Sequence, residues 1–188
     1  MAEGLELEFT ERTKRIGIMI AIMATVLALS EAAGQNAQAD SIRQTVEASN
    51  LWAFFQAKTI RMTTLKSDAQ VLELEAMNIK PGPQATAFAK TIADWRATAE
   101  RYDSEPSSGE GRKELTARAK AMEVERDHNA ATNATFDLAT GALQIGILLA
   151  STAVVTDILA FAFAGAAAGV IGIVLALFAL FAPSVFGG

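Results

Sequence analysis

The end of the sequence lacks charge over a length that few folds can accommodate. The 31 residues from Ile158 to Gly188 contain no charged side chain, whereas a helix needs roughly 20 apolar residues to cross the hydrocarbon core of a bilayer. A chain of 188 residues is too short to bury this length as a hairpin inside one soluble domain. The run therefore predicts a transmembrane helix at 158–182 and a short tail at 183–188, which begins with the helix breaker Pro183.

A second uncharged segment comes directly before the first. Leu138 to Thr156 contains 19 residues without a charge, and Asp137 and Asp157 stand at its two ends. A charged residue is tolerated in a turn between two spans and is costly inside one. We therefore expect a further transmembrane helix at 134–156 and a tight turn near Asp157.

A shorter apolar segment, Ile16 to Leu29, lies near the N-terminus. Its 14 residues would rise about 21 Å as a helix, so a span must continue past Ser30 and Glu31, and we place it at 16–36. The basic residues in the preceding tail at 1–15 and the Ala-Gln-Ala sequence at 37–39 also fit a secretory signal peptide. We expect the segment to be retained as a signal anchor.

The distribution of Lys and Arg predicts an orientation. Arg12, Lys14 and Arg15 precede the first span, whereas the turn near Asp157 and the C-terminal residues carry no basic side chain. Three more basic residues lie close to the second span, but in a segment too long to count for much. Cytoplasmic segments next to spans are enriched in Lys and Arg. We expect a multi-pass protein of the cell (inner) membrane with a cytoplasmic N-terminus and the middle region on the opposite side.

The middle region, at 37–133, is charged and water-compatible. Residues 40–127 hold 13 of the 16 basic and 14 of the 21 acidic residues, so the region is close to neutral. Nucleic-acid binding requires a clustered basic excess, and no nucleic acid is expected as a partner. Apolar residues recur at helical spacing, and no segment alternates as a strand would. The fold class is therefore predicted as all-α: an integral membrane protein with about three transmembrane helices and an extramembrane, coiled-coil-like helical hairpin or three-helix bundle.

Three helices are predicted in this region. The first, Asp40 to Met77, carries mostly apolar or small residues in alternating steps of four and three, a spacing typical of a packed amphipathic helix. These residues are Ile42, Val46, Ser49, Ala53, Gln56 and Ile60. Turn-forming residues separate it from a second helix, Gln84 to Asp103, and from a third that begins at Arg112 and continues into the second span. The core-facing residues of the second and third helices are predicted to be Phe88, Ile92, Trp95, Ala99, Tyr102, Leu115, Ala119 and Met122.

Aromatic residues give the first of these helices apolar groups on more than one face. Trp52 and Phe55 lie toward one side, and Phe54 is about 100° away from Phe55 around the helix. Either the bundle surrounds this helix, or the second face meets another subunit. Trp52, Phe54 and Phe55 are therefore candidate packing or oligomer residues.

The segment from Val46 to Arg61, VEASNLWAFFQAKTIR, resembles the most recognisable segment of a bacterial membrane-protein family designated domain of unknown function 4337. Members are similar in a pattern of small residue, Ser, Trp, Ala, two aromatics, Gln, Ala and Lys, and in having one apolar segment before it and two after it. Leu51 stands where a polar residue is common, and Phe54-Phe55 where Tyr often appears. The resemblance implies a membrane protein and supplies no activity, substrate or catalytic residue.

Few residues carry chemistry. The chain has no Cys, which excludes disulfides and thiolate sites. Glu125 and the single histidine, His128, form half of the Glu-x-x-His arrangement found in di-iron helix bundles, but a solvated helix face explains the pair equally well. We assign no catalytic, cofactor-binding or metal-binding residue, and expect neither an enzyme nor a cofactor.

Polar residues in the spans are candidates for a functional face. Thr140, Gln144 and Ser151 recur on one side of the second span, where they would either hydrogen-bond between packed helices or line a pore. Glu31 joins them because a carboxylate inside a span is costly and therefore a functional candidate. If the first span reaches the interface at Ser30, Glu31 simply lies in water.

Glycines on the third span suggest close helix packing. Gly165, Gly169 and Gly172 share one helical face, and small residues let two helices approach closely. The face would pack against the other spans or against a neighbouring chain.

These features lead to a functional expectation. We expect a non-enzymatic, self-associating integral membrane protein that acts as a scaffold or accessory subunit, with the lipid bilayer and further copies of itself as partners. The alternative is a homo-oligomeric channel or pore lined by the polar residues of the second span. A membrane-bound metal or redox enzyme would rest on Glu125 and His128 alone.

Overall fold

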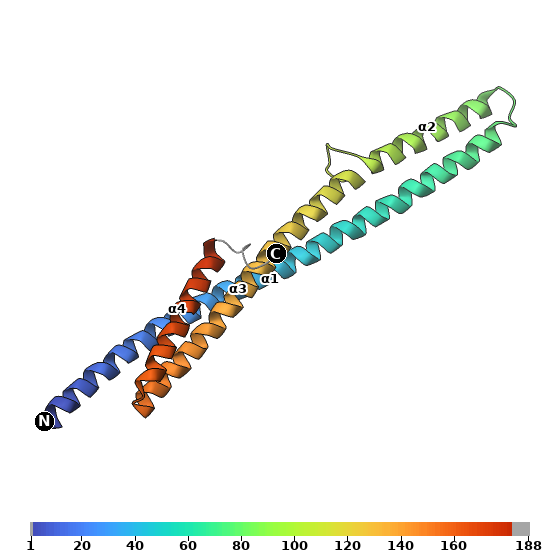
Figure 1. The fold of residues 1–188 in the computed structure, drawn as a ribbon. Coiled ribbons are helices and arrows are strands. Elements are labelled where there is room, and N and C mark those ends of the chain that lie inside the picture. Colours follow the sequence, from blue (N-terminus) through green and yellow to red (C-terminus); the bar gives the residue numbers. More distant parts are fainter. Residues whose placement is uncertain (1, 182–188) are drawn as a thin grey trace. The chain divides into compact units, whose positions relative to one another are not determined.

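The protein is described by a computed structural model that covers residues 2–181, and the described chain contains four α-helices and no strand (Figure 1). The helices are α1 (Ala2–Ala76), α2 (Pro83–Asp103), α3 (Arg112–Thr156) and α4 (Leu159–Phe181). The predicted all-α class is confirmed. The predicted tail at 183–188 and residue 182 of the third span lie outside the described residues.

Three of the helices are long and apolar enough to cross a membrane: α1, α3 and α4. The third middle helix was predicted to begin at Arg112 and to run into the second span, and α3 confirms this. The prediction that a separate helix begins at Asp40 is wrong, because α1 continues through this point without a break. Gln35, Asn36 and Gln38 interrupt the apolar pattern there, but they do not interrupt the backbone hydrogen bonds that define a helix.

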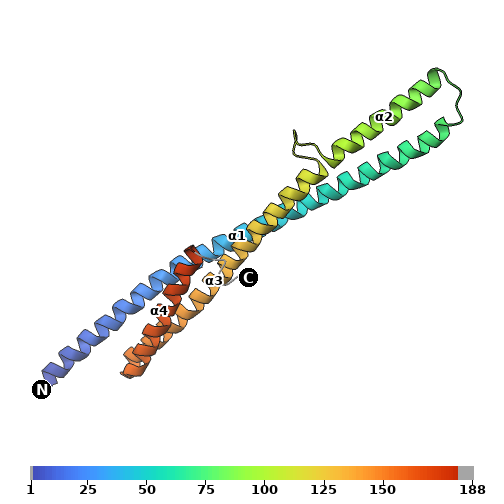
Figure 2. The ribbon, with the colours of Figure 1, turned by 45° about the horizontal axis from the view of Figure 1, so that its top comes forward.

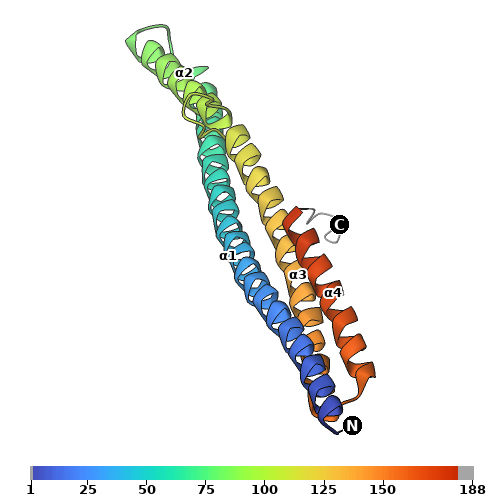
Figure 3. The same cartoon turned by 90° about the vertical axis from the view of Figure 1, so that its left-hand side faces the viewer.

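The chain divides into two compact units. Met1–Ile42 and Glu125–Gly188 form one, called here the terminal unit, and Arg43–Val124 form the other, called the hairpin unit. Figures 2 and 3 show α4 running beside the C-terminal part of α3 within the terminal unit. Its core is made by Met23 of α1, Phe136 and Leu143 of α3, and Ala176 of α4, each at most 6% exposed.

In the hairpin unit, one face of α1 is covered and its residues follow a heptad spacing. The covered residues alternate in steps of four and three, which is the 3.5-residue repeat of a left-handed coiled coil. This inner stripe consists of Gln44, Ala48, Leu51, Phe55, Lys58, Met62, Leu65 and Ala69. Leu51 packs against Leu115 and Ala119 of α3, and Ile92 and Ala99 are the buried residues of α2. The core faces predicted for the second and third helices are therefore correct.

The core face predicted for the first helix is not the covered one. Ile42, Val46 and Ile60 are 58%, 56% and 68% exposed. Each predicted residue is followed two places later in the sequence by a covered one. Because the predicted face is exposed, the other helices do not surround α1. The sequence pattern concealed the covered face because it includes Lys58, whose side chain is only 7% exposed.

Candidate functional site

The glycines of α4 bring helix backbones into direct contact. A Cβ atom added at Gly165 would lie 2.8 Å from the backbone nitrogen of Ala150 and 2.8 Å from the carbonyl oxygen of Gly146. A Cβ added at Gly146 would in turn lie 2.9 Å from the nitrogen of Gly169. Real Cβ atoms essentially never come this close to backbone atoms. The contact between α3 and α4 therefore depends on glycine from both helices.

The other two glycines of α4 face side chains of the same chain. A Cβ at Gly169 would meet the sulfur of Met23 on α1, and one at Gly172 would lie 2.6 Å from the Cγ atom of Leu143 on α3. Of the two arrangements left open by the sequence, the structure has the glycine face packed within its own chain. Gly146 was missed, although Gly146 and Ala150 form a visible i, i+4 pair of small residues on the second span.

The polar candidates of the spans lie on α1 and α3 of the terminal unit. The side-chain amide of Gln144 donates to Oε1 of Glu31 over 3.4 Å, and both residues are exposed. Thr140 and Ser151 are both half-buried. The hydroxyl of Thr140 donates to the backbone carbonyl of Phe136 over 2.5 Å. The structure thus brings together Glu31 and Gln144 on the outer surface of the unit.

The connection between α3 and α4 lies beside the N-terminal basic residues. Asp157 adopts φ 58°, a left-handed conformation that Asp tolerates better than most residues. Its carboxylate lies 3.5 Å from a guanidinium nitrogen of Arg12 on α1, with both side chains well exposed. A surface pair of this kind adds little stability, but it places this connection at the same end of the terminal unit as Arg12.

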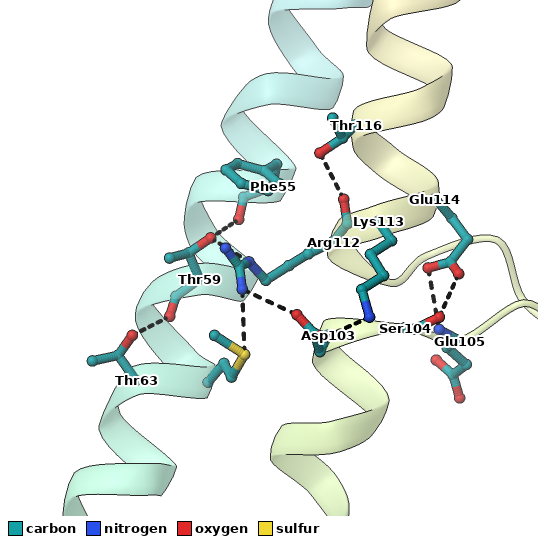
Figure 4. Close-up of polar contacts among 11 residues, drawn as sticks. Phe55, Thr59, Thr63, Asp103, Ser104, Glu105, Arg112, Lys113, Glu114 and Thr116 are labelled. Atoms are coloured by element: carbon teal, nitrogen blue, oxygen red, sulfur yellow. Dashed lines mark hydrogen bonds and ion pairs between the residues drawn. The ribbon is translucent and has the colours of Figure 1, made fainter.

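A cluster of polar side chains joins the three helices of the hairpin unit (Figure 4). The Arg112 guanidinium lies 4.9 Å from the centre of the Phe55 ring, and its Nε donates to the hydroxyl of Thr59 over 2.9 Å. A terminal nitrogen of Arg112 lies 3.2 Å from Asp103, and Nζ of Lys113 lies 2.9 Å from the same carboxylate. The hydrogen bond from Lys113, helped by the charges of both cations, holds the pKa of Asp103 below its ordinary value of 3.8.

A second carboxylate closes the loop between α2 and α3. Glu114 accepts a hydrogen bond from the hydroxyl of Ser104 over 2.7 Å and one from the backbone N–H of Glu105 over 3.2 Å. These bonds, the first most of all, lower the pKa of Glu114 below 4.5. The Cβ of any other residue at Gly111 would meet the Glu114 carboxylate and the nitrogen of Glu105. Close approach therefore requires glycine at position 111.

The segment from Val46 to Arg61 supplies further contacts of the hairpin unit. Trp52 donates its indole N–H to Glu123 over 2.9 Å and stacks edge-to-face on Phe55 at 5.6 Å between ring centres. Nζ of Lys58 lies 3.6 Å from Glu110 and 5.2 Å from the centre of the Phe54 ring. Trp52 and Phe55 are half-buried, and Phe54 is 37% exposed. Trp52, Phe55 and Lys58 therefore pack within the hairpin unit, whereas Phe54 lies at its surface.

Within the described part of the chain, no group of three or more His, Asp or Glu side chains is placed to hold a metal ion. His128 is exposed. An open groove of 380 Å³ in the hairpin unit is lined by charged and amide side chains, among them Lys66, Arg96 and Glu100.

Comparison with known proteins identifies the family alone. Searches of curated proteins and of solved structures return no match. A family model described as a domain of unknown function, DUF4337, matches residues 12–182, which include most of α1, the whole of α3 and α4, and the whole hairpin unit. The chain belongs to the DUF4337 family.

Proposed function

We propose that this protein is a non-enzymatic integral membrane protein with three spans, which acts as a self-associating scaffold or accessory subunit. One observation carries the proposal: the terminal unit has glycine-packed helices inside and large apolar side chains outside. Leu148, Phe163 and Val170 are 66%, 72% and 61% exposed. Such a surface is an aggregation hazard in water and is satisfied by lipid.

The proposed topology has the N-terminus in the cytoplasm and the hairpin unit on the opposite side of the cell (inner) membrane. Arg12, Lys14 and Arg15 support this orientation because basic residues next to spans stay cytoplasmic. Three spans require the α3–α4 connection to share a side of the membrane with the N-terminal tail. The Arg12–Asp157 pair is consistent with that requirement.

Cysteine labelling tests insertion and orientation together, because the chain contains no Cys of its own. Ser107→Cys places a thiol in the exposed loop of the hairpin unit, and Glu11→Cys places one on the N-terminal side of the first span. In intact cells, a membrane-impermeant maleimide should label Ser107→Cys and spare Glu11→Cys. The reverse pattern would invert the topology, and recovery of the protein in the soluble fraction without detergent would refute the proposal.

A homo-oligomeric pore is the second candidate function. The Glu31–Gln144 contact favours it, because a polar pair on the outer surface of a span would face lipid in a monomer and needs a partner or water. The test is ion flux into proteoliposomes, with Gln144→Leu compared with Leu148→Ala on the same helix. Flux that is absent from the unmodified protein, or unchanged in Gln144→Leu, would reject this candidate.

A further inference from the structure

A second heptad stripe runs along the exposed side of α1 in the hairpin unit. Its residues alternate in steps of four and three, over 29 residues from Val46 to Leu74. This outer stripe consists of Val46, Ser49, Ala53, Gln56, Ile60, Thr63, Ser67, Gln70 and Leu74, all of them exposed. It extends over about four heptads, which is long enough for a coiled-coil seam.

The outer stripe is distinct from the inner one and lies across the helix from it. Seven of its nine positions, Val46 to Ser67, come two residues before an inner-stripe position, which corresponds to about 200° of rotation at 100° per residue. The inner stripe packs on α3 and, through Lys58, contacts the Tyr102 ring of α2; both helices lie on one side of α1 in the hairpin unit (Figure 1). α1 therefore has the pattern of two opposite coiled-coil seams, and the chain itself covers only one.

The absence of charge from the outer stripe requires an explanation. Charged residues are frequent on the rest of the exposed surface of this segment, including Glu47, Arg61 and Asp68, yet none of the nine stripe residues is charged. Val46, Ile60 and Leu74 are 56%, 68% and 63% exposed. A merely solvated helix face has no reason to exclude charge at every heptad position.

We propose that the outer stripe pairs with the outer stripe of a second copy of this chain, in parallel and in register. This inference rests on the proposed function in one respect: copies inserted in one bilayer with one topology leave it in the same direction. In a parallel pair each seam residue faces its own counterpart. An uncharged stripe is then complementary to itself, whereas a charged one would repel its copy.

The residues that flank the stripe agree with this pairing. In the heptad of the outer stripe, Val46, Ala53, Ile60, Ser67 and Leu74 take position a. In a parallel coiled coil, the residue at position g, directly before each a residue, faces the e residue that lies five places later on the partner helix. Lys66 then faces Val71, Thr59 faces Thr64, and Trp52 faces Ala57. No like charges meet along the seam. Lipid is a poor occupant for the same surface, because the remaining faces of the hairpin unit carry charges and ion pairs.

The composition of the stripe indicates a weak and selective pairing. One set of alternate positions holds mostly apolar residues, such as Val46, Ile60 and Leu74, and the other holds Ser49, Gln56, Thr63 and Gln70. Polar seam residues reduce stability and fix register. Anchoring both copies in one membrane raises their effective concentration, so a weak seam is sufficient there.

The proposal is tested by disulfide cross-linking of single-cysteine variants in native membranes. Val46→Cys and Ile60→Cys place thiols on the seam, and Arg61→Cys places an exposed thiol one residue away from it. Seam residues facing their own counterparts come within the Cα–Cα distance of about 4.4–6.8 Å that a disulfide spans. Under mild oxidation, both seam variants should become mainly dimeric, and Arg61→Cys should remain mainly monomeric.

A further substitution separates pairing from chance collision. Ile60→Asp in the Val46→Cys background should lower the dimer yield by about tenfold or more, because two carboxylates would face each other across the seam. Ile60 is 68% exposed within one chain, so the substitution leaves the hairpin fold intact, and circular dichroism checks this.

The possible results discriminate clearly. Equal cross-linking of Arg61→Cys would refute the seam. Cross-linking at Val46 or Ile60 alone would refute parallel, in-register pairing, and a cross-linked band that contains a different protein would assign the stripe to another partner. Alkaline carbonate extraction of the same membranes keeps this inference separate from the proposed function. An extracted protein contradicts membrane insertion, whereas a retained protein without cross-links contradicts only the pairing.

Discussion

The contact between α3 and α4 predicts that adding a single methyl group at Gly146 will loosen the terminal unit. The Cβ of Gly146→Ala would lie 2.9 Å from the nitrogen of Gly169 and 3.0 Å from the carbonyl oxygen of Gly165. Ordinary van der Waals contact begins at 3.4 Å, and backbone atoms cannot rotate away as a side chain can. α4 must therefore move by several tenths of an ångström. Overpacking of this kind costs about 1–3 kcal/mol.

Gly141 provides a matched control on the same helix. A Cβ added there meets nothing within 4 Å. Both Gly→Ala substitutions gain the same helix propensity, about 1 kcal/mol in water, so this gain cancels when the two variants are compared. Gly146→Ala should therefore be less stable than Gly141→Ala by about 1–3 kcal/mol, the whole cost of overpacking.

The difference can be read from the opening of the helix bundle. A reporter cysteine at Ala153, which is 4% exposed, reacts with a maleimide in detergent only when the packed helices separate. A difference of 1–3 kcal/mol corresponds to labelling about 5–150-fold faster in Gly146→Ala than in Gly141→Ala. Equal labelling rates in the two variants would show that α3 and α4 do not touch at Gly146.

Three further outcomes are expected. Arg112→Ala should destabilise the hairpin unit by about 1 kcal/mol, because the contacts with Phe55 and Asp103 are lost from a half-exposed site; an unchanged thermal midpoint in circular dichroism would contradict this. The lowered pKa of Asp103 in the folded chain stabilises the hairpin above pH 3.8, and this contribution is lost as the pH falls below that value. The protection factors for hydrogen exchange at the C-terminal end of α2 should therefore fall in acid, and fall by less in Asp103→Asn, where Lys113 has no carboxylate to bind. Asp157→Ala should cost about 1 kcal/mol more than Asp157→Gly, because alanine is strained at φ 58° and glycine is not, while both lose the contact with Arg12; the Ala153 reporter would contradict this by labelling at equal rates in the two.

Much of the hairpin unit followed from local pattern. The faces of α2 and the N-terminal part of α3 were predicted correctly because Ile92, Ala99, Leu115 and Ala119 are apolar and helically spaced. On α1 the same reasoning selected the wrong face, since the covered stripe contains the charged Lys58, whereas no residue of the outer stripe is charged. Local pattern measures side-chain polarity, and it cannot measure the partners that compensate a buried charge.

The sequence by itself determined the all-α class, the three long apolar helices and the family. These properties depend on composition and periodicity along the chain, which are local quantities. Only the tertiary structure decided which face of α1 is covered, because burial of Lys58 depends on Glu110 and on the ring of Tyr102, both distant in sequence. It also decided that Gly165 and Gly169 meet Gly146 and Met23 of their own chain. Such a contact exists only where two particular helices cross, and no spacing within one helix specifies its partner.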